Sequence, residues 1–152
     1  MDNKFIGLFI ALFIVIFAMG SVNASNLVDH NFDNYFSMKI PDGVNFEKED
    51  SSENDLISVS YSNDEIVIVY TDGPMYSEKS YDFFMSSILG SVFPDLDQYY
   101  ESQEGNLKIF EPTMTSDEYL PMVGTYSGNK LVIIFGPDVN QLKEMGNSIE
   151  FN

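Results

Sequence analysis

The clearest pattern in the chain is an alternation of apolar and polar residues that predicts β-strands. In the stretch LISVSYS, Ile57, Val59 and Tyr61 alternate with serines, as in a strand that is buried on one face. The next run, EIVIVYT, is apolar on both faces from Ile66 to Tyr70, which predicts a central strand covered on both sides. Weaker patterns predict further strands at 35–40, 44–50 and 107–112.

A β-hairpin is predicted in the stretch YLPMVGTYSGNKLVIIFGPD. Gly128 and Asn129 suit a two-residue turn with glycine first. That turn places Tyr126 opposite Leu131 in the paired strands. Tight turns of this kind join antiparallel strands, so we expect an antiparallel sheet.

Two helices are expected after the central strands. The first covers 77–92, begins at Ser77 and ends before Pro94. Its apolar positions form one stripe at helical spacing: Tyr81, Phe84, Met85, Ile88, Leu89 and Val92. The segment 95–106 reads either as a further helical turn or as a loop.

The second helix follows Asp138, which suits its N-cap. Gln141, three residues later, completes the pattern of a capping box. Val139, Leu142 and Met145 are expected to face inward, and Gly146-Asn147 to end the helix. The final SIEF is a candidate strand.

The N-terminus has the features of an export signal. The sixteen residues 5–20 carry no charge, and a helix of that length spans only about 24 Å. This is short for a bilayer core of roughly 30 Å. Small or short residues precede Ser25, which predicts signal-peptide cleavage after Ala24. The alternative is an uncleaved anchor, and in either case the body of the protein lies outside the cytoplasm.

These patterns predict one domain after the signal. Residues 1–24 form the signal peptide or anchor, an N-terminal hydrophobic helix; residues 25–34 form a polar linker; residues 35–152 form a single α+β domain. We expect an antiparallel sheet with helices packed on its faces, an α-β-α sandwich.

Composition narrows the functions that this domain can have. The net charge is −17, and cleavage after Ala24 leaves it unchanged because Asp2 and Lys4 are lost together. An acidic surface without a basic patch disfavours binding to nucleic acid or to anionic lipid headgroups. We therefore expect no nucleic-acid partner, and contact with a membrane only through the N-terminal segment. The charge serves solubility or, alternatively, the binding of a cation or a cationic partner.

Several residue types are missing or rare. The chain has no Cys, which excludes disulfides and thiolate nucleophiles and fits prokaryotic export better than a eukaryotic secretory route. It has no Arg, so a guanidinium clamp on phosphate is excluded. The single histidine, His30, lies in the predicted linker, where we expect a solvated side chain rather than a catalyst.

Three stretches together resemble a known family. FSMKIPDGVNF near the start, EIVIVY before an amphipathic segment, and GNKLVIIFGPD followed by LKEMGNSIEF are similar to motifs of PsbP-like domains. Those are extrinsic proteins of the photosystem II lumen and small exported relatives in prokaryotes. The resemblance spans 35–151 and implies a sheet between helices. It implies no catalytic residues, and Val44 or Phe46 stands where the family often has Trp.

Acidic residues are the main material for chemistry. The nearest pairs are Asp95 with Asp97, Glu101 with Glu104, and Asp117 with Glu118. A hydrolase of the glycosidase type needs two carboxylates that face each other across a cleft, which close neighbours in a polar loop do not provide. Asp95, Asp97 and Glu101 offer oxygen ligands for Ca²⁺ but lack the spacing of a calcium loop.

The function expected from these features is that of a non-enzymatic binding or accessory domain outside the cytoplasm. No catalytic, cofactor-binding or metal-binding residues are assigned. Four tyrosines near loops are candidates for gripping a sugar or a protein partner: Tyr76, Tyr99, Tyr100 and Tyr119. The alternatives are an extracytoplasmic hydrolase that uses paired carboxylates, and a membrane-tethered subunit of a cell-envelope assembly.

Overall fold

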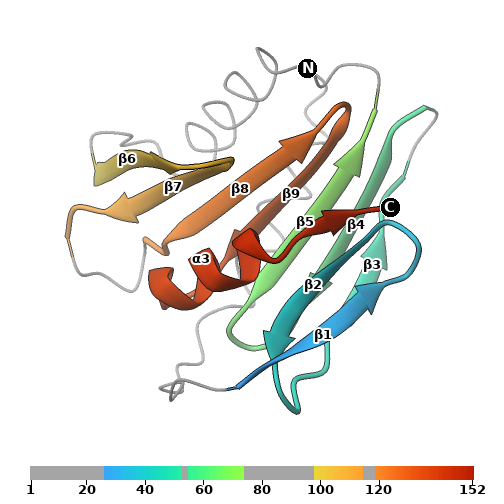
Figure 1. The fold of residues 1–152 in the computed structure, drawn as a ribbon, viewed down its shortest axis with the longest axis horizontal. Coiled ribbons are helices and arrows are strands. Elements are labelled where there is room, and N and C mark those ends of the chain that lie inside the picture. Colours follow the sequence, from blue (N-terminus) through green and yellow to red (C-terminus); the bar gives the residue numbers. More distant parts are fainter. Residues whose placement is uncertain (1–25, 53–54, 74–97, 115–118) are drawn as a thin grey trace.

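Two antiparallel sheets dominate the computed structural model, which describes residues 26–52, 55–73, 98–114 and 119–152 (Figure 1). The larger sheet has seven strands in the order β3-β4-β5-β9-β8-β7-β6, and the smaller has the order β1-β2-β10. Their bounds are β1 Leu27–Phe32, β2 Phe36–Pro41, β3 Glu47–Asp50, β4 Ile57–Ser62, β5 Val67–Asp72, β6 Tyr99–Glu104, β7 Leu107–Pro112, β8 Met122–Ser127, β9 Lys130–Phe135 and β10 Glu150–Phe151.

The alternating and fully apolar strands are where the sequence predicts them. In β4 the side chains of Val59 and Tyr61 are buried, and β5 is buried on both faces along almost its whole length. The position of β5 between β4 and β9 confirms that it is a central strand.

The predicted hairpin is confirmed in detail. β8 pairs with β9, and Tyr126 lies opposite Leu131. Gly128 has a φ of 61°, the left-handed conformation that the first position of such a turn needs. The turn therefore fixes the register of the two strands.

The core lies between the two sheets. β1 and β2 lie over one face of the seven-stranded sheet, beside the described helix α3, Val139–Asn147 (Figure 1). Phe32 and Phe36 stack at 4.7 Å between ring centroids, and Tyr70 of the larger sheet stacks on Phe36 at 5.6 Å. Aromatic stacking thus joins the small sheet to the large one.

The opposite face of the seven-stranded sheet is also apolar. By alternation it carries the buried side chains of Val67, Val69, Phe110, Met122, Leu131, Ile133 and Phe135. Residues 74–97 connect β5 to β6, and the predicted helix at 77–92 lies outside the described residues.

The helix α3 is held by its cap and by one close contact. Asp138 accepts hydrogen bonds from the main-chain N–H groups of Asn140 and Gln141, which confirms the predicted N-cap. Leu142 and Met145 are fully buried. The helix ends at Asn147, as the Gly146-Asn147 pair predicts. A Cβ on Gly146 would lie 2.9 Å from a methyl group of Leu107, so this glycine also allows the last turn to pack closely on β7.

The expected α+β sandwich with helices on its faces is wrong for the described residues, which form two antiparallel sheets and one helix. The reason is that β2 does not join the central sheet. Its apolar side chains Phe36, Met38 and Ile40 all point to one side, and with β1 and β10 this strand forms a separate layer that covers the core where a helix was expected.

Two local expectations also need correction. The stretch 25–34, expected to be a polar linker, contains β1, which pairs with β2 along its whole length. The stretch 95–106, expected to be a helical turn or a loop, contains β6, which pairs with β7 through a turn at Gly105 with a φ of 58°. Both strands are largely exposed, so they lack the apolar alternation that identifies a strand.

The predicted signal segment, 1–24, with its cleavage site after Ala24 and its hydrophobic helix, lies outside the described residues. Among the residues that are described, no helix is long and apolar enough to span a bilayer.

Candidate functional site

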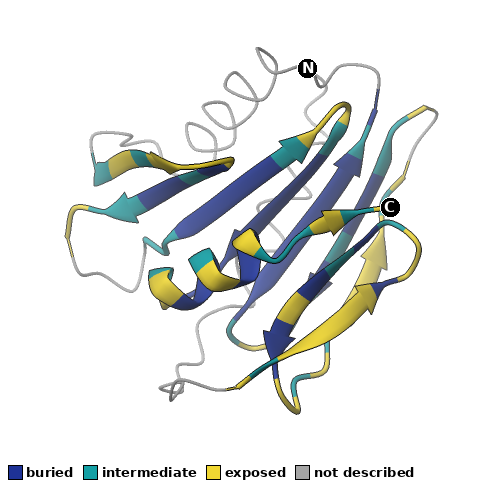
Figure 2. Cartoon of the chain, viewed as in Figure 1, coloured by how far each residue is buried: buried dark blue, intermediate teal, exposed yellow. Residues whose placement is uncertain are grey.

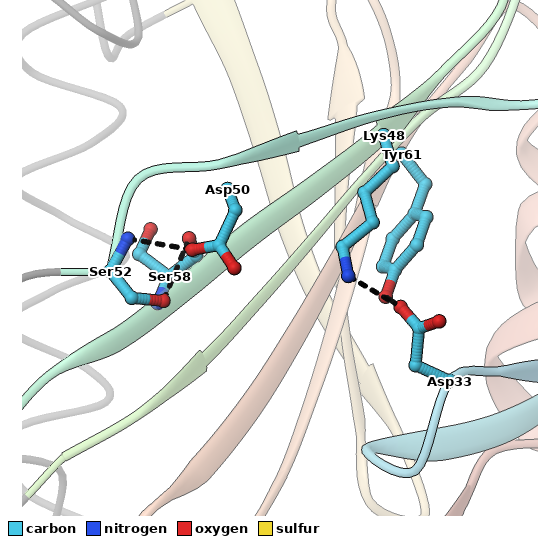
Figure 3. Close-up of polar contacts among 6 residues, drawn as sticks. All are labelled: Asp33, Lys48, Asp50, Ser52, Ser58 and Tyr61. Atoms are coloured by element: carbon cyan, nitrogen blue, oxygen red, sulfur yellow. Dashed lines mark hydrogen bonds and ion pairs between the residues drawn. The ribbon is translucent and has the colours of Figure 1, made fainter.

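A charged cluster joins the tip of the small sheet to the large one (Figure 3). Asp33 lies in the turn between β1 and β2. Its Oδ2 atom accepts a hydrogen bond from the Tyr61 hydroxyl at 2.7 Å and forms an ion pair with Lys48 Nζ at 2.8 Å. Asp33 has a φ of 54°, a left-handed conformation that aspartate tolerates better than most residues. The Lys48 ammonium also lies 5.7 Å from the centre of the Tyr35 ring.

The electrostatics of this cluster favour the ionised carboxylate. The hydrogen bonds from Lys48 and Tyr61 hold the pKa of Asp33 below its ordinary value. Burial, followed by the Asp33 carboxylate, raises the pKa of Tyr61 well above its ordinary value. Tyr61 therefore stays protonated and donates its hydroxyl hydrogen to Asp33. This hydrogen bond helps to hold the two sheets together.

A second polar group lies at the other end of β3. Asp50 accepts a hydrogen bond from the main-chain N–H of Ser52 at 3.0 Å, and the Ser52 hydroxyl accepts one from the N–H of Ser58 at 3.1 Å (Figure 3). Hydrogen bonds from Ser52, first from its hydroxyl and then from its main-chain N–H, lower the pKa of Asp50. The Asp50–Ser52 and Ser52–Ser58 hydrogen bonds both involve main-chain N–H groups, so they fix the path of the loop after β3.

Within the described residues, an open recess of about 1140 Å³ lies on the small sheet next to the C-terminal end of α3. The main-chain N–H of Lys39 donates to the Ser148 hydroxyl at 2.8 Å, which in turn donates to the carbonyl of Met145 at 2.6 Å. Ser148 thus ties β2 to α3 at the floor. The other polar residues that line the recess include Asn26, Asp29, His30, Asn31, Ser37, Glu144, Asn147 and Glu150.

The described lysines are mostly engaged within the chain. Lys48 pairs with Asp33, Lys108 with Glu101 at 3.3 Å, and Lys143 with Glu104 at 2.5 Å. Lys130 donates to the main-chain oxygen of Asn152. In the described part of the chain, Lys39 is the lysine whose ammonium group has no such partner, and it lies in the recess.

The candidate carboxylate pairs are not brought together where the structure places them. Glu101 and Glu104 are three residues apart on β6, so their side chains point to opposite faces. Each forms an ion pair with a different lysine. The pairs Asp95 with Asp97 and Asp117 with Glu118 lie outside the described residues.

Of the candidate calcium ligands, only Glu101 is described, and Asp95 and Asp97 are not. Within the ranges that the structure covers, no three acidic or histidine side chains gather as a metal site would require. The expectation of no cofactor and the Ca²⁺ alternative therefore both stay untested.

The tyrosines expected near loops differ in their surroundings. Tyr99 donates to the carbonyl of Leu120 at 3.2 Å and contacts the Tyr119 ring edge-on at 6.0 Å. Burial raises the pKa of Tyr99. Tyr100 is 66% exposed, and Tyr76 lies outside the described residues. Tyr100 alone of these four offers a free ring on the described surface.

His30 lies on β1 rather than in a linker. Its side chain is exposed and meets the Phe32 ring edge-on at 4.6 Å, so it lines the recess without a catalytic neighbour among the described residues. Sequence reasoning missed both the recess and the Asp33 cluster. One signal pointed to the cluster: Lys48 alternates in phase with Phe46, which places a charge on the inward face of β3.

No protein-family model, no curated protein and no solved structure matches this chain. The PsbP-like resemblance therefore stays a prediction.

Proposed function

We propose that this protein is a non-enzymatic binding domain that acts outside the cytoplasm and holds a cationic partner. The N-terminal segment supports the location, because its length and its ending at Ala24 are typical of an export signal. The charge balance of the folded body supports the partner's chemistry.

The observation that carries the proposal is that acidic side chains far outnumber the lysines available to pair with them, so most of the negative charge on the surface is not neutralised within the chain. The chain has 24 Asp and Glu against 7 Lys and Arg. Four of the described lysines are already held by a carboxylate or a main-chain oxygen. The remaining carboxylates therefore create a negative potential that attracts cationic groups and speeds their association.

The test measures binding of the full chain to immobilised poly-lysine and, as the matched control, to poly-glutamate, over a range of salt concentrations. We expect retention on poly-lysine alone, with elution as salt shortens the screening length. Equal retention on both polymers, or on neither, contradicts the proposal.

The location is tested separately by fractionating cells that express the chain and sequencing the N-terminus of the product. An extracytoplasmic product that begins at Ser25 supports export with cleavage. A product that begins at Met1 in the membrane fraction supports the tethered alternative, and a cytoplasmic product contradicts both.

A further inference from the structure

The outer edge of the small sheet is an exposed strand. β1 is the terminal strand in the order β1-β2-β10, so only one of its edges is paired within that sheet. Four of its six residues, from Val28 to Asn31, are exposed, and the strand stands out as an exposed arrow in Figure 2. An unpaired edge presents a row of N–H and C=O groups to which another strand can bond.

The register identifies the groups that point outward. The N–H of Lys39 points away from β1, because it donates to Ser148 on the side of β10. Asp29 is the partner of Lys39 in the β1–β2 register, so its own main-chain groups also point away from the ladder. By alternation, Leu27, Asp29 and Asn31 direct their N–H and C=O groups to the open edge.

This edge lacks the protection that the edge strand β3 has. All four residues of β3 are charged, and its Lys48 points inward to Asp33. Short, fully charged edges with an inward lysine discourage further pairing. β1 has six residues, a single charge at Asp29, and no lysine or proline, so a further strand meets no such obstacle.

The recess next to this edge is acidic. Asp29, Glu144 and Glu150 line it, against Lys39 and the single His30. The three carboxylates come from β1, α3 and β10, and none of them forms an ion pair with another described residue. A strand added along β1 would lie beside Asp29, whereas Glu144 and Glu150 lie beyond β2 and act only through the wider negative potential. A lysine or arginine of the added strand on the same face as Asp29 would be attracted to its carboxylate.

We propose that the open edge of β1 binds an extended basic peptide segment by β-strand addition. Main-chain hydrogen bonds to Leu27, Asp29 and Asn31 provide affinity, and the Asp29 carboxylate, within an acidic surface, selects basic side chains. A second copy of this chain is a poorer occupant of the edge, because two acidic surfaces repel each other. This inference rests on the proposed function, since it specifies where and how the cationic partner binds.

The test uses the full chain and a fluorescent eight-residue peptide of alternating lysine and threonine. Two derivatives carry N-methyl groups on alternate main-chain nitrogens, one in each of the two phases. In an added strand, one phase faces β1 and the other faces solvent. We expect one derivative to bind as the parent does and the other to lose at least tenfold in affinity, because only one removes hydrogen bonds to the edge.

Variants of the chain test the same contacts from the other side. Asn31→Pro removes an N–H that faces outward, so the β1–β2 ladder stays intact, and we expect it to abolish peptide binding. Asn31→Ala, the matched control, keeps the N–H and should bind normally. Asp29→Asn removes the carboxylate of the edge itself and should weaken binding about two- to fivefold at low salt. Glu47→Gln and Glu49→Gln on β3 make the same change of charge elsewhere and should not weaken it.

The outcomes separate this inference from the proposed function. If the peptide binds but both methylated derivatives bind equally, the cationic partner stands and the β1 edge is overturned. An eight-residue peptide of alternating glutamate and threonine is the charge control, and if it binds as well as the lysine–threonine peptide, the acidic selection is overturned. If no basic probe binds, both proposals fail. Because the methylated peptides use the unaltered chain, the test holds even if Asn31→Pro does not fold.

Discussion

Asp33 is a charged residue that links the two layers of the protein at their edge. It lies in a strained turn, outside the apolar core, and yet it receives a tyrosine hydroxyl from β4 and an ammonium group from β3. Its carboxylate is about half exposed, so solvent screens part of the attraction. The cluster therefore stabilises the junction of the sheets modestly and depends on the charge of one group.

Asp33→Asn should lower the free energy of unfolding by about 1 kcal/mol at pH 7, because it removes the charge but tolerates the turn. The pKa of Asp33 is lowered in the folded state, so its contribution is present above the unfolded pKa of about 3.9. It is lost as the pH falls through the lower folded pKa. Urea unfolding across this range should thus show the difference from the unaltered protein disappearing at low pH.

The exposed Asp64 provides the control, because no described residue pairs with it. Asp64→Asn should keep the free energy of unfolding within a few tenths of a kcal/mol of that of the unaltered protein, both at pH 7 and at low pH. Asp33→Ala should be worse than Asp33→Asn, because alanine disfavours a φ of 54°. A pH-independent loss in Asp33→Asn would mean that shape rather than charge matters in the cluster.

Gly146 gives a second prediction for a single residue. Gly146→Val should destabilise the protein by about 1–3 kcal/mol, because its Cβ would lie 2.9 Å from a Leu107 methyl group in a filled core. Equilibrium unfolding in urea measures this. Asn140→Ala, on the exposed side of α3, is the control and should be close to neutral. A neutral Gly146→Val would show that the helix can move away from β7.

At the scale of elements, the sequence predicts those strands and turns that depend on residues close together in the chain. Alternation located β4 and β5, and two turn residues fixed the register of β8 and β9. The three-stranded sheet was not predictable in this way, because Lys39 and Ser148, which bond at its centre, are 109 residues apart. The same distance hid the recess, whose lining comes from both ends of the described chain.

The N-cap of α3 is the element feature most open to test. Asp138→Ala should cost about 1 kcal/mol, because two N–H groups lose their acceptor. Asp138→Asn keeps an acceptor and should retain most of the stability. Urea unfolding of the two variants decides: equal losses would show that the capping bond contributes little.

At the scale of the whole molecule, the net charge of −17 sets the response to salt. Raising NaCl from about 10 mM to about 150 mM shortens the screening length from about 30 Å to about 8 Å. Repulsion among the carboxylates should weaken more than the few ion pairs do, so the melting temperature should rise by a few degrees. Scanning calorimetry measures it, with sucrose at equal osmolality as the control. A fall in melting temperature would show that the ion pairs outweigh the repulsion.

The pairing of β5 with β9 has a consequence for the order of folding. β5 ends at Asp72, but its inner neighbour β9 begins only at Lys130, and β2 meets β10 later still. A chain emerging from the ribosome therefore holds a strongly apolar strand with one edge unpaired until most of its length has been made. Contacts this distant in sequence slow folding and leave time for aggregation. We infer that this protein depends on remaining unfolded and protected until synthesis is nearly complete.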